Sequence, residues 1–224
     1  MRGTTGIIKF LGGWALWLLL ACGASAAPAP SPQVADAVTR LQALYTDEWA
    51  WRQQEFAYEE VDGEWKPSDH FASVTPESWQ RRATYWRQVL DALDAIPIAA
   101  LPHEEQVNAA VFRADIEAMH ANATWRTWEA PFNSDSFFWG YLNPAQPYRT
   151  EADWRRFIGR LRDLPRYFDE HIANMERGLA RGWSVPRESI EGRDRTLEPY
   201  TRKDARNPFL DTIARMPDTM PAPV

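Results

Sequence analysis

The amino-acid sequence predicts an all-α protein, a multi-helix array of about five to six helices. Apolar residues recur at helical spacing along several long segments. Capping motifs, in which a hydroxyl residue precedes Pro or acidic residues, stand in front of some of these segments. No segment shows the sustained alternation of apolar and polar residues that a half-buried strand requires.

The first helix is predicted from Gln33 to about Glu60, because its apolar residues fall close to helical spacing. A stretch with Gly and Pro at residues 61–69 then breaks the pattern. Thr75 caps a second helix, with Pro at its first position, and Pro97 ends it.

A third helix is predicted to start after residues 101–105 and to run to about Trp128. Its expected packing stripe consists of Val107, Ala110, Val111, Ala114, Ala118, Ala121 and Trp125. Residues 129–149 lack periodicity and are expected to form a long irregular connection, a kind of segment that is often functional.

Thr150 and Asp153 predict the capped start of a fourth helix. Pro165 is expected to interrupt this helix, which resumes and ends near Gly182. A short helix is predicted near residues 187–192, followed mostly by coil.

Residues 1–26 have the features of an export signal: two basic residues, a short apolar run and the small residues Ala24-Ser25-Ala26. Cleavage is expected after Ala26, which leaves a Pro/Ala linker at residues 27–32. Leu19-Leu20-Ala21-Cys22 also resembles a lipoprotein box, in which Cys22 would carry a lipid anchor. The protein is therefore expected to be periplasmic or an outer-membrane lipoprotein, with no transmembrane span after signal removal.

Charge and cysteine content exclude several classes of function. The chain has a net charge of −6, and loss of residues 1–26 removes two bases and no acid, which gives −8. An acidic exported domain is a poor candidate for binding nucleic acid. Because Cys22 is the only cysteine, the mature domain has no internal disulfide and no zinc–thiolate site.

Two histidine motifs resemble metal sites but are incomplete. His103-Glu104-Glu105-Gln106-Val107 begins like a zinc-binding His-Glu-x-x-His sequence, but the second His is missing. Glu117 and His120 have the spacing of carboxylate-bridged di-metal bundles, which need a second such pair. We therefore expect no metal ligand and no catalytic residue in this chain.

The aromatic residues allow two interpretations. Core anchoring fits the tryptophans at helical positions, namely Trp49, Trp79, Trp86, Trp125 and Trp154. An aromatic-lined cleft is the alternative where periodicity fails, at Trp128, Phe132, Phe137, Phe138, Trp139 and Tyr141.

Several segments together resemble a known family. They are residues 45–52, 129–133, 163–168, 174–182, 185–187 and 190–194. In this order and spacing they resemble the N-terminal third of the bacterial "domain of unknown function 885" family, over residues 38–224. The resemblance implies an exported, helical, zinc-metallopeptidase-like hydrolase with a His-Glu-x-x-His helix.

That zinc-binding motif is absent from this chain, so zinc is expected only in a full-length parent protein. The resemblance therefore implies that residues 33–224 are an N-terminal helical part of the family domain, incomplete at its C-terminus and inactive alone. In the parent it would form a wall of the channel for a peptide or small amide substrate, for which we expect Phe132, Asn133 and Trp139. The alternative function is a periplasmic helical binding or interaction domain with an aromatic ligand surface at residues 128–148.

Overall fold

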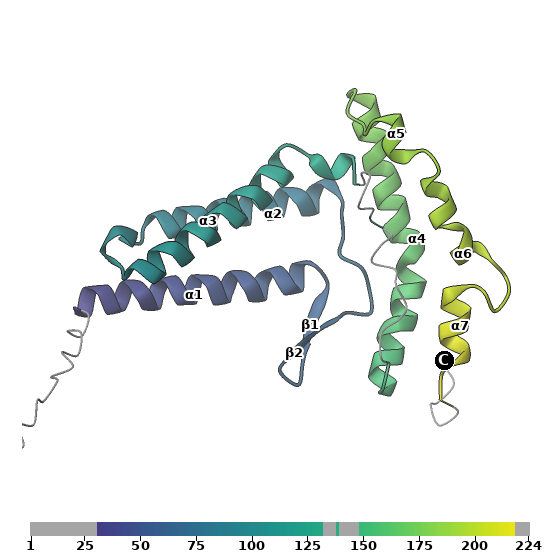
Figure 1. The fold of residues 1–224 in the computed structure, drawn as a ribbon, viewed down its shortest axis with the longest axis horizontal. Coiled ribbons are helices and arrows are strands. Elements are labelled where there is room, and N and C mark those ends of the chain that lie inside the picture. The colour runs from purple at the N-terminus through teal and green to yellow at the C-terminus, as the bar shows by residue number, and fades with distance from the viewer. Residues whose placement is uncertain (1–30, 132–137, 139–147, 218–224) are drawn as a thin grey trace, which may run out of the picture.

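A computed structural model describes residues 31–131, 138 and 148–217 of the chain (Figure 1). The predicted all-α class is confirmed, since helices dominate and the only described strands form one short hairpin. The elements are α1 (Pro32–Glu55), β1 (Tyr58–Val61), β2 (Glu64–Pro67), α2 (Pro76–Asp94), η1 (Ile98–Ala100), α3 (His103–Thr124), η2 (Thr127–Glu129), α4 (Glu151–Ala180), α5 (Arg187–Ile190), η4 (Arg193–Thr196), α6 (Glu198–Thr201) and α7 (Pro208–Ala214).

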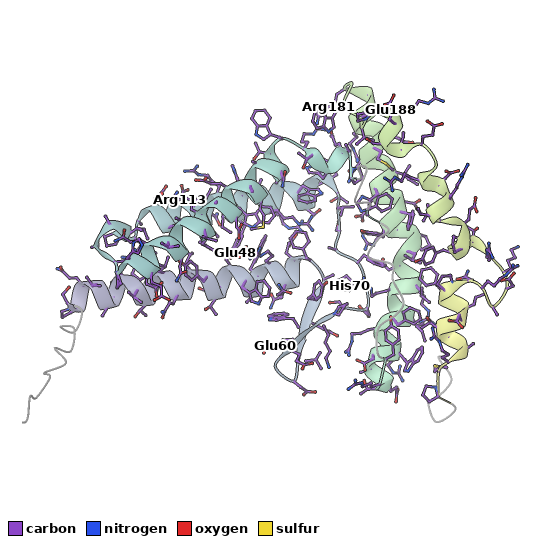
Figure 2. All side chains as sticks on the ribbon, in the orientation of Figure 1. Glu48, Glu60, His70, Arg113, Arg181 and Glu188 are labelled. Carbon is purple, nitrogen blue, oxygen red and sulfur yellow. The ribbon has the colours of Figure 1, made fainter. Side chains whose placement is uncertain are left out.

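Helices α1, α2 and α3 lie alongside one another in an elongated unit, with α4 standing across one end (Figure 1). The predicted cap at Thr75 is confirmed, because its hydroxyl accepts a hydrogen bond from the Ser78 amide. The core between these helices is apolar around Leu41 and Leu93. Around Trp86 the core includes the buried carboxylate of Glu48, which accepts a hydrogen bond from the Trp86 indole (3.3 Å). Glu48 lies on α1 between the three helices (Figure 2).

The predicted end of the first helix at about Glu60 is wrong. Helix α1 ends at Glu55 because Ala57 adopts φ 60°, a left-handed conformation that stops the helix. The chain then forms the antiparallel pair β1–β2, in which Glu60 lies opposite Trp65. Asp62 and Gly63 both have positive φ, as a tight Asp-Gly hairpin turn requires.

The predicted packing stripe of α3 is also wrong. Val107, Val111 and Trp125 are exposed, and the buried positions are Ala109, Ile116 and Ala123. The helix is rich in alanine and has apolar residues on more than one side, so its sequence pattern does not select the face that packs. Trp49, expected in the core, is likewise exposed.

Pro165 does not interrupt the fourth helix, contrary to expectation. Helix α4 runs unbroken from Glu151 to Ala180, and it begins with the predicted capping box of Thr150 and Asp153. Leu164 and Phe168, on either side of Pro165 in sequence, pack into a cluster with Phe71 and Phe138. This packing offsets the missing amide donor of proline.

The extended segment before α2 is held against α4 by charged side chains. Asp163 accepts a hydrogen bond from the Phe71 amide (2.7 Å), and Glu170 accepts one from the Val74 amide (2.7 Å). Arg166 pairs with both carboxylates and donates to the Phe71 carbonyl (2.7 Å). Backbone groups that have no partner in a helix or sheet are therefore satisfied by α4.

The last part of the chain is more ordered than the predicted coil. The helical turns α5, η4 and α6 and the helix α7 run back along α4 on the side away from α1–α3 (Figure 1). Asn207 caps α7 and also donates hydrogen bonds to the carbonyls of Tyr200 and Arg202 (both 2.8 Å). Phe209 of α7 packs against the cluster on α4.

Candidate functional site

A groove of about 770 Å³ lies between α2, the end of α3 with η2, and the C-terminal half of α4. We call it the α2–η2 groove. Its lining residues are Pro76, Trp79, Gln80, Ala83, Thr84, Arg87, Gln88, His120, Ala123, Thr124, Arg126, Trp128 and Arg177. Its volume is in the range of sites that bind small molecules or short peptides.

Two tryptophans form an apolar part of the groove. The rings of Trp79 and Trp128 are parallel within 3°, with centroids 6.2 Å apart. Trp128 is held by a hydrogen bond from its indole nitrogen to the Ala123 carbonyl (3.3 Å). The guanidinium of Arg82 stands 4.5 Å from the centre of the Trp79 ring, a cation–π contact that fixes this side chain.

The charged side chains of the groove are all basic. Arg87, Arg126 and Arg177 line it together with His120, and no described Asp or Glu is among the lining residues. This differs from the chain as a whole, which has a net charge of −6. Because Arg87 and Arg126 have carboxylate partners outside the lining, Arg177 contributes most to any positive potential that would attract an anion to the groove.

The buried carboxylate of Glu129 fixes one edge of the groove. It is 1% exposed and forms ion pairs with Arg126 and with Arg181. Arg181 lies at the end of α4 (Figure 2). Gly178 permits this close approach of η2 to α4, because a Cβ there would stand 2.8 Å from the Glu129 carbonyl oxygen. The position of Arg126 at the edge of the groove therefore depends on the contact of Glu129 with Arg181 and Gly178, which are distant from it in sequence.

The three predicted substrate-wall residues, Phe132, Asn133 and Trp139, lie outside the described residues, as do Ala26 and Cys22. Of the other residues of the predicted aromatic cleft, Trp128 and Phe138 are described, and both are buried: Trp128 is 8% and Phe138 is 6% exposed. Phe138 stacks on His171, with ring centroids 4.0 Å apart. These two residues are therefore not part of an exposed aromatic ligand surface, although Trp128 contributes to the groove.

The incomplete metal motifs remain incomplete in space. Throughout residues 31–131, 138 and 148–217, no three His, Cys, Asp or Glu side chains form a group that could hold a metal ion. Glu117 is exposed and pairs with Arg113 (3.8 Å), while His120 lines the groove. The described residues thus do not fit the zinc ion that the family resemblance implies, and no zinc ligand is assigned to them.

The sequence did not single out the basic residues of the groove. Arg87, Arg126 and Arg177 come from α2, the turn after α3, and α4, so no local spacing relates them. The one usable signal was local: Trp125-Arg126-Thr127-Trp128 places an arginine between aromatic residues near a helix end.

No described helix is long and apolar enough to cross a membrane.

Comparison with known proteins finds a match to the sequence model of one protein family. Neither the curated proteins nor the solved structures contain a significant match to the chain. The sequence model of the family described as "Bacterial protein of unknown function (DUF885)" matches residues 27–222, which is most of the chain. The chain therefore belongs to the DUF885 family.

Proposed function

We propose that this chain forms a substrate-binding wall of an exported, zinc-dependent peptide or amide hydrolase. The observation that carries the proposal is the α2–η2 groove, which combines two stacked tryptophans with three arginines. Apolar area next to a few placed charges is the usual composition of a ligand site. The hydrolytic class rests on the family resemblance.

In this proposal the described residues bind and orient substrate and do not cleave it. Trp79, which is half-buried, offers apolar surface to a substrate side chain and is supported by the parallel ring of the buried Trp128, and the arginines offer donors to the polar groups of the substrate. Zinc, where bound, would activate water for hydrolysis. Its ligands are expected outside the described residues, because these contain no suitable group.

Peptide binding and cleavage by the full chain test the proposal. The protein is incubated with a pool of short peptides, bound peptides are recovered by gel filtration, and products are sought by mass spectrometry with added Zn²⁺ or with a chelator. We expect bound peptides and no cleavage in either condition. Failure to retain any peptide would contradict a substrate wall, and zinc-dependent cleavage by this chain would contradict a purely binding role.

A self-contained helical binding domain is the second candidate. The groove favours this candidate, because a binding domain needs a ligand site and no metal ion. Among the described residues, no group of side chains could hold a metal ion. Urea unfolding separates the two. Coincident transitions by circular dichroism and tryptophan fluorescence favour an independent binding domain. Non-coincident transitions with binding of an apolar dye favour a wall that packs on further structure.

A further inference from the structure

The side chains of the α2–η2 groove indicate what kind of chemical group it selects. Three arginines and a histidine line the groove, and no described carboxylate is among its lining residues. Two of the arginines already have partners: Arg87 pairs with Asp91 (2.6 Å), and Arg126 pairs with the buried Glu129. The third arginine is therefore the one to consider.

Arg177 is the cation most available to a ligand. It is exposed, and its hydrogen bond goes to the neutral side-chain oxygen of Asn174 (2.9 Å). Among the described residues, no carboxylate forms an ion pair with it; Glu77 at the start of α2 is close enough to interact with it electrostatically, but this carboxylate does not line the groove. That single bond to the buried Asn174 orients the guanidinium, while its remaining N–H donors stay free to bind an anion.

The apolar part of the groove stands beside this charge. The parallel rings of Trp79 and Trp128 belong to the same set of lining residues as Arg177. A ligand that presents an anionic group and a neighbouring aromatic or aliphatic group would satisfy both features. In a peptide, a carboxylate next to a large apolar side chain has this form.

We propose that the α2–η2 groove binds a peptide carboxylate, held by Arg177, together with an adjacent aromatic or apolar side chain placed against the half-buried Trp79, whose ring is parallel to that of Trp128. The inference rests on the proposed function and names the class of substrate. A terminal α-carboxylate and an Asp or Glu side chain share this chemistry, so the experiment has to distinguish them.

Three peptides of one length test the inference on the full chain by isothermal titration calorimetry. The first is Ala-Ala-Phe with a free C-terminus, the second is its C-terminal amide, and the third is Ala-Glu-Phe amide. Binding of the first alone identifies the terminal carboxylate, and binding of the third as well identifies any carboxylate. Equal binding of all three would overturn carboxylate selection but leave peptide binding intact. Absence of binding by all three would count against the proposed function itself.

Arg177→Gln tests the assigned residue. We expect it to weaken binding of the carboxylate peptide by about tenfold or more, since a charge-assisted hydrogen bond is lost. The matched control is Arg155→Gln, on the exposed side of α4 and paired with Glu151 (2.5 Å), which should bind as the wild type does. Unchanged affinity in Arg177→Gln, with circular dichroism showing a folded protein, would overturn the assignment.

Discussion

Asn174 donates a hydrogen bond to the carbonyl oxygen of Val74 over 2.6 Å, although 100 residues separate the two in sequence. Asn174 lies on α4 and is fully buried, while Val74 ends the extended segment before α2. Together with the hydrogen bonds that Asp163 and Glu170 accept from amides of the same segment, it joins α4 to the three-helix unit. The relative position of α2 and Arg177, on which the groove depends, rests on this contact.

Substitution of Asn174 by Leu is expected to destabilise the protein by about 1–3 kcal/mol, because the Val74 carbonyl loses its bond inside the protein. The free energy of unfolding in urea measures the effect. Asn108→Leu, at an exposed position of α3, is the matched control and should change stability by less than about 0.5 kcal/mol. Equal stability of the two variants would show that the contact contributes little.

Gly178→Ala should destabilise the junction of η2 with α4. The added Cβ would stand 2.8 Å from the backbone oxygens of both Glu129 and Trp183, so the backbone itself would have to move. We expect a loss of about 1–3 kcal/mol, typical of overpacking. Glu176→Ala, at an exposed position two residues earlier, serves as the control in thermal unfolding. A Gly178→Ala protein as stable as the wild type would contradict the close approach.

His171 is expected to make stability depend on pH. It is 6% exposed and stacked on Phe138, and burial lowers its pKa to about 4. In the unfolded chain the pKa of His171 is about 6.5, so between these two pKa values the unfolded state binds a proton that the folded state does not. Stability is therefore fully present above about pH 6.5 and falls by about 3 kcal/mol as the pH drops to about 4.

Urea unfolding of His171→Leu across this pH range tests that dependence. The variant has no imidazole to titrate at this site, so the corresponding part of the decrease in stability should disappear. His103→Gln, at an exposed position, should keep the decrease seen in the wild type. An unaltered pH profile in His171→Leu would assign the effect to other groups.

Processing at the N-terminus remains a prediction from sequence. Expressed in a bacterium, the mature protein is expected to begin at Ala27 and to be recovered from the periplasmic fraction. Mass spectrometry of the purified protein gives its first residue. Cys22→Ser should leave both results unchanged; loss of a lipid-modified, membrane-bound form in this variant would instead establish the lipoprotein alternative.

The helix starts were predictable because their signals are local. The capping hydroxyls of Thr75 and Thr150 bond to amides three residues away, so neighbouring residues contain all the required information. The ends and faces of helices were less predictable. Pro165 lies inside a continuous helix because packing of residues distant in sequence compensates for its missing donor.

The sequence by itself determined the helical class, the family and two capped helix starts, since periodicity, capping chemistry and ordered motifs are properties of short segments. Tertiary structure alone decided which side of α3 is buried, that Phe138 is buried while the mostly buried Trp128 lines the groove, and that arginines from three elements share this groove. These features depend on how α4 packs against η2 and the segment before α2. Such packing is a relation between residues up to about a hundred positions apart, and no local pattern specifies it.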